Sequence, residues 1–255
     1  MVNLLVVDVG NTHTVLGYFE GKALKADWRL TTRRDATADE IGISVTGLLQ
    51  TGGFRPARAI VATVVPSLHF PWRSAFRRYF EMEPLFVEPG IRTGMPILYE
   101  NPQEVGADRI VNAVAAVEKY GGPCIVVDFG TATTFDAITA GGEYLGGAIC
   151  PGVQISADAL FQRAARLPRI DVRKPLRVVG RTTVGAMESG LFYGYVGLVE
   201  GLVRRMGDEI GGNAMCIATG GLADVIATET SLIDHVDADL TLQGLRIVWE
   251  RNQPD

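Results

Sequence analysis

The sequence lacks the short motifs that mark the commonest nucleotide-binding and metal-dependent enzymes. Its 255 residues contain no Walker A loop, no G-x-G-x-x-G turn and no H-E-x-x-H pair. The three cysteines show no C-x-x-C spacing and the three histidines lie far apart, so we expect buried, reduced thiols and no zinc site. Any nucleotide chemistry must therefore use other turns of the chain.

Positive charge and long apolar runs are also scarce. The net charge is −5 and the isoelectric point is near 5.3, which argues against a nucleic-acid partner held by a general basic surface. The arginine pairs, including Arg33-Arg34, are expected on solvated helix faces. No uncharged stretch approaches the ~20 residues of a membrane span, and the apolar N-terminus carries Asp8 without a basic lead-in. We therefore expect no membrane partner and a cytoplasmic protein.

Two similar runs are present instead, and the rest of the chain is organised around them. Residues 4–12 read LLVVDVGNT and residues 125–134 read IVVDFGTATT. Each is a short apolar run, which predicts a buried strand, followed by Asp, an apolar residue, Gly and a turn rich in hydroxyl or amide groups. Such a turn suits phosphate oxygens, and the carboxylate suits a divalent ion. Two copies predict a duplicated fold that binds one polyphosphate.

Each run alone has a simpler interpretation. A strand that ends in Asp-x-Gly is more often an ordinary β-turn in which the aspartate bonds its own backbone. Two copies in the same order are less easily explained by coincidence, so the functional interpretation is favoured.

The remaining pattern predicts an α/β protein with strands and helices in alternation. We expect an N-terminal domain over residues 1–120 and a C-terminal domain over residues 121–255, with a hinge at Gly121-Gly122-Pro123. In the first domain, strands are expected over 3–9, 15–19, 26–31, 59–65 and 85–87, with helices from 37, over 67–80 and over 104–120. In the second, strands are expected over 124–129, 132–139, 143–150 and 214–218, with a helix over 238–251.

Residues 183–206 predict an unusual helix. Gly190, Gly194, Gly197 and Gly201 recur at helical spacing, although each glycine costs ~1 kcal/mol inside a helix. Two interpretations remain open: close packing against the protein's own sheet, or contact with the same helix of a second subunit.

The segment Gly106-Ala107-Asp108-Arg109 is the candidate for acid–base chemistry. Asp108 is expected in the first turn of a helix, where such residues usually only complement the helix dipole. An arginine follows it directly, and Tyr99 lies shortly before it. An arginine can hold a substrate carboxylate while an aspartate accepts a proton from a hydroxyl group.

Four segments together carry a resemblance to a known family. Asp8-Val9-Gly10-Asn11-Thr12, Gly106 to Arg109, Asp128 to Thr134 and Thr219-Gly220-Gly221 occur in the order and spacing of type III pantothenate kinases. This family belongs to the acetate and sugar kinase/Hsc70/actin superfamily, and the resemblance runs from the first strand to the final helix.

The resemblance implies two ribonuclease-H-like (actin-like) domains, each a mixed five-stranded sheet with helices on both faces, and an ATP cleft between them. It implies a kinase that phosphorylates pantothenate to 4′-phosphopantothenate with ATP, the first step of coenzyme A biosynthesis. Mg²⁺, a monovalent cation (K⁺ or NH₄⁺) and a homodimer are implied as well, with a substrate pocket that borrows from the neighbouring subunit.

The resemblance also implies roles for individual residues. Asp108 matches the general base, Asp128 a ligand of the monovalent cation, and Asp8 a residue that acts on Mg²⁺ through phosphate or water. The matched ATP-binding residues are Asp8, Val9, Gly10, Asn11, Thr12, His13, Thr14, Val15 and Thr131. The matched pantothenate-binding residues are Tyr99, Gly106, Ala107, Asp108, Arg109 and Thr183.

Two other functions stay open on the residues alone. Another kinase or phosphohydrolase of the same superfamily would share the phosphate turns and differ only at residues 99–109 and Thr183. A nucleotide-dependent regulatory module would bind ATP without an acceptor, and would not need an Asp-Arg pair. ATP consumption with and without pantothenate separates these functions.

Overall fold

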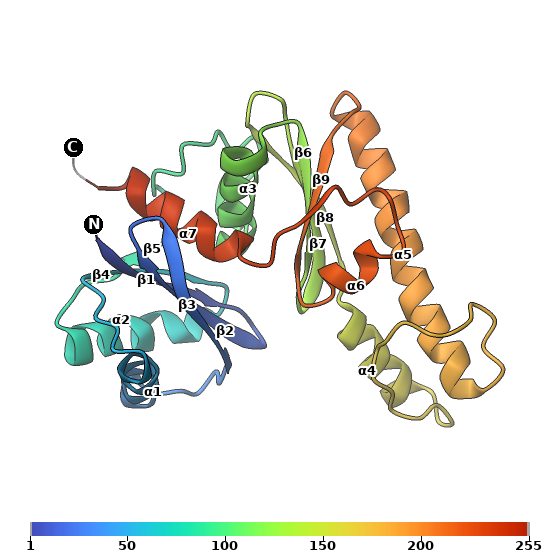
Figure 1. The fold of residues 1–255 in the computed structure, drawn as a ribbon, viewed down its shortest axis with the longest axis horizontal. Helices are drawn as coiled ribbons and strands as arrows, with labels where there is room; N and C mark the ends of the chain where they lie inside the picture. Colours follow the sequence, from blue (N-terminus) through green and yellow to red (C-terminus); the bar gives the residue numbers. More distant parts are fainter. Residues whose placement is uncertain (1, 254–255) are drawn as a thin grey trace. The chain divides into compact units, whose positions relative to one another are not determined.

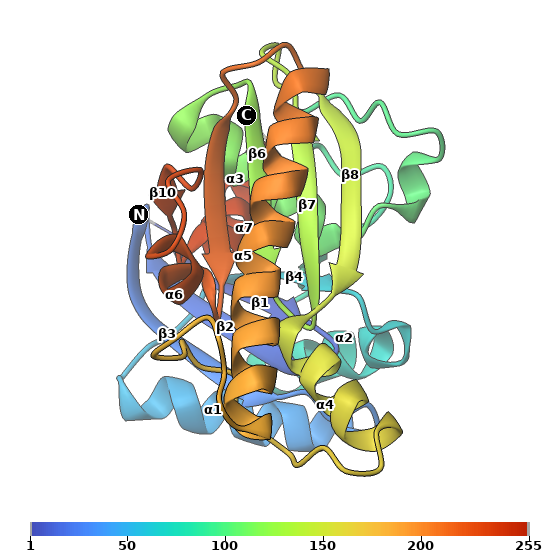
Figure 2. The same ribbon diagram turned by 90° about the vertical axis from the view of Figure 1, so that its right-hand side faces the viewer.

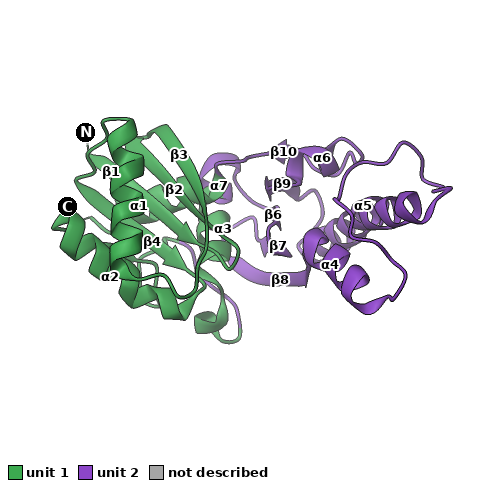
Figure 3. Cartoon of the chain, turned by 90° about the horizontal axis from the view of Figure 1, so that it is seen from below, with its two compact units in different colours: residues 1–94, 100–115, 240–255 green, residues 95–99, 116–239 purple. Residues whose placement is uncertain are grey.

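The computed structural model describes residues 2–253, and the chain forms two compact units (Figures 1 and 3). Unit 1 comprises residues 1–94, 100–115 and 240–255, and unit 2 comprises residues 95–99 and 116–239. The chain thus passes between the units four times. The expected single division after residue 120 differs from these units, because the C-terminal helix packs with the first sheet; that domain division stays a prediction.

Unit 1 is built on a mixed five-stranded sheet with the order β3-β2-β1-β4-β5. Its strands are β1 (Asn3–Val9), β2 (His13–Glu20), β3 (Ala23–Thr31), β4 (Arg58–Thr63) and β5 (Leu85–Phe86). Its helices are α1 (Ala38–Thr51), α2 (Pro66–Phe80), the 3₁₀ turn η1 (Pro102–Glu104), the first part of α3 (Ala107–Tyr120) and α7 (Leu240–Arg251).

Both faces of this sheet are covered by helices. Leu5, Val7 and Val9 point from β1 into a core formed with α1 and α2. On the opposite face α7 contacts β1 and β4, and Gly244 of α7 lies against the backbone of Val111 in α3. Because β1 is buried on both faces, it reads as a continuous apolar run, as expected for a central strand with a parallel neighbour.

Unit 2 repeats the plan with a sheet of order β8-β7-β6-β9-β10. Its strands are β6 (Cys124–Phe129), β7 (Ala132–Ile138), β8 (Tyr144–Pro151), β9 (Met215–Gly220) and β10 (His235–Val236). Its helices are α4 (Val153–Arg163), α5 (Thr183–Glu209), α6 (Ala223–Ala227) and the last residues of α3. Figure 2 shows α5 running along the sheet and beyond its end, beside α4.

The predicted fold class of two mixed five-stranded sheets with helices is confirmed. Element boundaries differ by a few residues. The helix expected from Glu104 begins at Ala107, because residues 102–104 form the separate 3₁₀ turn, capped by the side chain of Asn101. The helix expected from 238 begins at Leu240, and the two-residue strand β10 was too short to be predicted from the sequence.

The glycine-rich helix is correctly predicted, but its glycines are not buried by the protein's own chain. Gly190, Gly194 and Gly197 are exposed, and a Cβ atom added at any of them would meet no atom within 4 Å. The structure therefore does not show this stripe packed against the protein's own sheet.

Candidate active site

The turn between β1 and β2 positions the first candidate residues. Asp8 is half-buried near the end of β1, between Val15 of antiparallel β2 and Ala62 of parallel β4. The Gly10 N–H donates to the His13 carbonyl at 3.0 Å, and a Cβ atom at Gly10 would lie 2.9 Å from that carbonyl oxygen. Glycine is therefore needed for the close return of the backbone.

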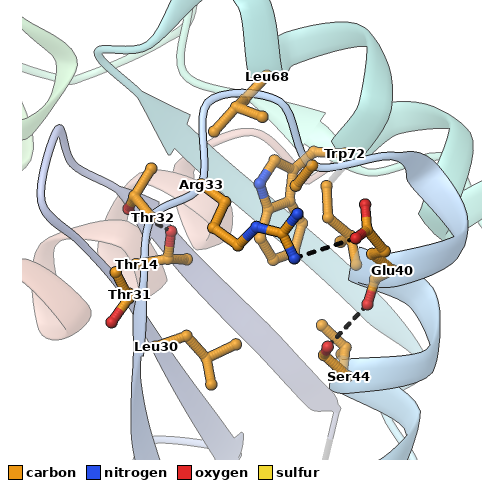
Figure 4. Close-up of a pocket in the computed structure, with 12 residues that line it drawn as sticks. Thr14, Leu30, Thr31, Thr32, Arg33, Glu40, Ser44, Leu68 and Trp72 are labelled. Carbon is orange, nitrogen blue, oxygen red and sulfur yellow. Dashed lines mark hydrogen bonds and ion pairs between the residues drawn. The ribbon is translucent and has the colours of Figure 1, made fainter.

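The nine residues matched to ATP binding do not all present side chains to solvent. Asn11, Thr12 and His13 are exposed at the tip of the turn. Val9 is fully buried in the core, so it can contribute only backbone atoms. Thr14 is also buried, and its hydroxyl lies 2.9 Å from the hydroxyl of Thr32 (Figure 4).

Asp108 lies in the first turn of α3, as the sequence predicts, and its carboxylate accepts a hydrogen bond of 2.8 Å from the Arg109 N–H. A Cβ atom at Gly106 would lie 2.5 Å from Asp108 Oδ1 and 3.7 Å from Val64. Val64 follows β4, and its N–H donates to the Val9 carbonyl at 3.1 Å. The start of α3 therefore lies beside the ends of β1 and β4.

The environment of Asp108 suits an acid–base group. Burial raises the pKa of its carboxyl above the ordinary value, against the opposing effects of the hydrogen bond from the Arg109 N–H and of the Arg109 charge. A carboxylate with a raised pKa is a stronger base than one in water. Arg109 is itself only 7% exposed, so the guanidinium charge is held in the same low-dielectric surroundings.

The turn between β6 and β7 positions the equivalent residues of unit 2. Asp128 is half-buried and pairs with Thr134 of β7 and Thr219 of β9. A Cβ atom at Gly220, whose φ is +90°, would lie 2.7 Å from Asp128 Oδ1. The backbone of β9 thus approaches the carboxylate as closely as a glycine permits.

Thr131 lies at the exposed tip of this turn. The Gly130 N–H donates to the Ala132 carbonyl at 3.1 Å, and the Gly152 N–H donates to the Thr131 carbonyl at 3.1 Å. A Cβ atom at Gly152 would lie 2.1 Å from the Thr131 oxygen. Gly152, which the sequence reading did not single out, therefore supports this turn from the start of α4.

The structure does not bring Tyr99 and Thr183 together within unit 2. The Tyr99 ring lies 6.4 Å from that of Tyr144, at the start of β8. Tyr195 of α5 bonds the carbonyl of Pro151, at the other end of β8. Thr183 precedes Tyr195 by twelve residues of helix, or about 18 Å, and Figure 2 shows this part of α5 beyond the sheet.

The contact of Arg34 with the β1–β2 turn was not predicted from the sequence. Arg33 and Arg34 do not lie on a helix face, contrary to the expectation, but on the segment between β3 and α1. Arg34 Nη2 donates to Asn11 Oδ1 at 3.0 Å. A signal existed, because the pair falls between a strand that follows the first phosphate turn and the capping box of Thr37 and Glu40.

The cysteines and the carboxylates restrict the kinds of metal site that the described side chains can form. Cys124, Cys150 and Cys216 are free thiols, and burial raises the pKa of Cys124 and of Cys216 to about 12. Among residues 2–253, no group of three or more His, Cys, Asp or Glu side chains could hold a metal ion. A divalent ion at Asp8 would therefore take its remaining oxygen ligands from water and phosphate, as Mg²⁺ commonly does.

None of the described helices is long and apolar enough to cross a membrane.

Solved structures share the fold at low sequence identity. A Campylobacter jejuni protein described as a member of the Baf family of transcriptional activators matches with a TM-score of 0.63 at 20% identity, over 97% of this chain and 98% of that chain. The inorganic polyphosphate/ATP-glucomannokinase of Arthrobacter sp. strain KM matches with a TM-score of 0.52 at 13% identity, over 98% of each chain. At these identities the similarities show that the fold is shared.

Sequence relatives are much closer. The type III pantothenate kinase of Koribacter versatilis is 55% identical over 98% of this chain and 96% of its own length. That of Anaeromyxobacter sp. (strain Fw109-5) is 55% identical over 98% of this chain and 100% of its own length. The family model for type III pantothenate kinase matches residues 4–205. The chain therefore belongs to the type III pantothenate kinase family.

Proposed function

We propose that this protein transfers the terminal phosphoryl group of ATP to the hydroxyl group of pantothenate, forming 4′-phosphopantothenate in the first step of coenzyme A biosynthesis. Family membership and relatives at 55% identity over nearly the whole chain support this activity. The single observation that carries the mechanism is the carboxylate of Asp108, held at the start of α3 with a raised pKa.

Asp108 is proposed as the general base. The hydroxyl group of pantothenate has a pKa far above neutrality, so its proton must leave as the oxygen attacks phosphorus. A positioned base contributes about 10²–10⁴-fold to such a rate. Gly106 supports this role, because it leaves room for the carboxylate: a Cβ atom there would lie 2.5 Å from Asp108 Oδ1. The remaining acceleration is expected from positioning and charge stabilisation of the phosphoryl group.

Residues Asp8 to Val15 are proposed to bind the ATP phosphates, with exposed Asn11, Thr12 and His13 at the tip of the turn. Mg²⁺, when bound, would neutralise developing phosphate charge. Asp8 fits such an ion, because it is a half-buried carboxylate beside a turn whose tip is exposed. Asp8 would hold the ion through water or phosphate.

Thr131 is proposed to contact the phosphates from unit 2, and Asp128 to bind a monovalent cation, K⁺ or NH₄⁺. The carboxylate of Asp128 supports this, because it lies beside the backbone of half-buried Gly220 and supplies oxygen atoms of the kind such an ion needs. Replacing K⁺ with Na⁺ at constant ionic strength is expected to lower the turnover rate. Equal rates in the two salts would contradict the cation role.

Tyr99, Gly106, Ala107, Asp108, Arg109 and Thr183 are proposed to form the pantothenate site. The separation of Tyr99 from Thr183 within unit 2 supports a site completed by a second subunit. The exposed glycine stripe of α5 supports a homodimer, since it offers a flat surface on which a second helix can pack closely. The oligomeric state is measured by sedimentation or light scattering.

We propose a cytoplasmic location, without a nucleic-acid or membrane partner. The net charge of −5 supports the absence of such partners, since it disfavours binding to polyanionic surfaces.

ATP consumption by the purified chain, with and without pantothenate in buffer containing Mg²⁺ and K⁺, tests the proposed function. Stoichiometric conversion of pantothenate is expected. Pantothenate-independent hydrolysis, or a preference for a sugar or acetate in a substrate panel, would instead support another kinase or phosphohydrolase of the superfamily. ATP binding without any turnover would support a regulatory module.

A further inference from the structure

A short segment between β3 and α1, residues 32–37, forms a strap against the β1–β2 turn. The Thr32 N–H donates to the Thr12 carbonyl at 2.9 Å, and the hydroxyls of Thr32 and Thr14 lie 2.9 Å apart. The strap therefore continues the pairing of β2 with β3 and contacts the turn directly. Figure 4 shows Thr14 and Thr32 on one side and Arg33 reaching toward Glu40 on the other.

The other end of the strap is attached to α1. Arg33 Nη1 lies 3.0 Å from Glu40 Oε1, and Thr37 and Glu40 form a reciprocal capping box at the start of the helix. Beneath the strap lies a small cavity of about 100 Å³ whose lining includes Leu68 and Trp72. Ala36 of the strap packs against the core of unit 1, and polar contacts of Thr32 and Arg33 hold the strap at its two ends.

Arg34 connects the strap to the tip of the turn. Its Nη2 donates to Asn11 Oδ1 at 3.0 Å, although both side chains are exposed. A guanidinium group has only donors, so it pairs with the oxygen of the Asn11 amide and leaves the amide NH₂ directed elsewhere. The contact thereby fixes which end of the Asn11 side chain a ligand at the turn meets.

The charge of the turn makes this contact significant. Residues 8–15 contain the carboxylate of Asp8 and no lysine or arginine. A polyphosphate approaching the turn therefore meets a negative group, backbone and hydroxyl donors, the neutral amide of Asn11 and the imidazole of His13. Arg34 provides a positive charge that is hydrogen-bonded to the turn itself.

We propose that Arg34 is a positioning residue of the phosphate site: it holds the Asn11 amide so that its NH₂ group donates to a phosphate oxygen of the bound nucleotide. This inference rests on the proposed function in one respect, namely that the β1–β2 turn binds nucleotide phosphate. It adds to the family's motif residues one that lies outside the Asp8–Val15 turn.

A double-mutant cycle on the dissociation constant of Mg·ATP, measured by calorimetry, tests the proposal. Arg34→Ala and Asn11→Ala are each expected to raise this constant about tenfold, and the double variant also about tenfold, because both remove the same interaction. Arg34→Lys is expected to restore most of the affinity, since an ammonium group can also donate to Oδ1. Arg78→Ala, which removes an exposed ion pair with Asp39 in the same unit, should leave the constant unchanged.

Several outcomes would overturn the proposal. A roughly hundredfold loss in the double variant would mean that Arg34 acts independently of Asn11. An unchanged constant in Arg34→Ala would remove its role altogether. Arg33→Ala breaks the attachment to Glu40 without touching Asn11, so an equal loss there would show that the fold of the strap matters rather than the Arg34 contact.

The binding measurement keeps this proposal separate from the proposed function. If the chain does not phosphorylate pantothenate but the cycle shows coupling, the function fails and the positioning role of Arg34 stands. If pantothenate is phosphorylated and the losses multiply, only the positioning role fails. Absence of any Mg·ATP binding by the unaltered chain would overturn both.

Discussion

The two units share one topology and differ in the side chains at its functional positions. In each sheet the central strand, β1 or β6, pairs antiparallel with the next strand and parallel with β4 or β9. Asp8 and Asp128 occupy equivalent positions, one residue before the end of the central strand. The strand order and pairing repeat, so differences in side chains indicate what each unit contributes.

One difference lies where the parallel neighbour ends. The Val64 N–H bonds the Val9 carbonyl in unit 1, and the Gly221 N–H bonds the Phe129 carbonyl in unit 2, at 3.1 and 3.2 Å. The residue whose N–H makes this contact is therefore valine in unit 1 and glycine in unit 2. A Cβ atom at Gly221 would meet no atom within 4 Å. Unit 2 leaves open space beside its aspartate, whereas unit 1 carries an apolar side chain at the equivalent position.

A second difference lies at the helix after the last strand of each sheet. Residues 105–108 read VGAD before Arg109, and residues 236–239 read VDAD before Leu240. Where unit 1 has Gly106, unit 2 has Asp237, which is buried and bonded to Lys119 and Tyr120. In unit 2 the carboxylate of Asp237 is therefore held in contacts within the fold. In unit 1 Gly106 has no side chain and leaves room for the carboxylate of Asp108.

The largest expected effect is that of Asp108→Asn, compared with Asp239→Asn, which ends the VDAD sequence directly before α7. Asp108→Asn is expected to lower pantothenate-dependent turnover by at least about 10²-fold while ATP affinity is retained, since the base is lost. Asp239→Asn should keep most of the turnover. Strong residual activity in Asp108→Asn, or an equal loss in Asp239→Asn, would break the comparison between the two helix starts.

For the same variant, the raised pKa of Asp108 also predicts the direction in which the Tm changes. The pKa of Asp108 is raised in the folded chain, so the unfolded chain ionises at lower pH and folding loses stability as pH rises through the raised value. Asp108→Asn should therefore have a Tm at pH 8 equal to or above that of the unaltered protein. The gain should shrink toward pH 4, near the pKa of an unfolded aspartate. A lower Tm at pH 8 would contradict the sign.

Gly220→Ala is expected to have the next largest effect. Its φ of +90° disfavours any side chain, and the new Cβ would lie 2.7 Å from Asp128 Oδ1. We expect a loss of about 1–3 kcal/mol in the free energy of unfolding, together with a weaker response of turnover to K⁺. Denaturant unfolding and rates in K⁺ and Na⁺ measure the two effects. An unchanged stability would show that the backbone at Gly220 is less constrained than its conformation indicates.

Gly221→Ala tests the open space in unit 2 at the position where unit 1 has the side chain of Val64. Because the added methyl group meets open space in the protein, the Tm should stay near its original value. If ligand occupies that space, the methyl group costs about 1–3 kcal/mol of binding, so the Michaelis constant for ATP should rise roughly tenfold. Unaltered kinetics would mean that this space is not part of the site.

The smallest effect is expected at two buried threonines that pair with the last residues of the central strands. The Thr14 hydroxyl bonds Thr32, whereas the Thr133 hydroxyl is buried with no hydrogen-bond partner among residues 2–253. Thr133→Val should therefore stabilise the protein by about 1 kcal/mol and Thr14→Val should destabilise it by a similar amount. Shifts of Tm in the same direction would show that the two positions are not distinguished by hydrogen bonding.

Periodic patterns and turn residues determined much of the fold. The apolar runs before Asp8 and Asp128 identified the central strands, and the turns that follow them identified the duplication, because strand periodicity and glycine turns act over a few residues. The first-turn position of Asp108 also followed from local signals. The family resemblance of the motifs was sufficient to predict the fold class and the family.

Only the tertiary structure decided the surroundings of those residues. Arg34 meets Asn11 across 23 positions of sequence, Asp237 meets Lys119 across 118, and the glycine stripe of α5 stays exposed although its spacing suited burial as well as contact. Local propensity specifies strands, helices and turns from neighbouring residues. Burial, pKa and hydrogen-bond partners depend on atoms that the chain brings together from distant positions.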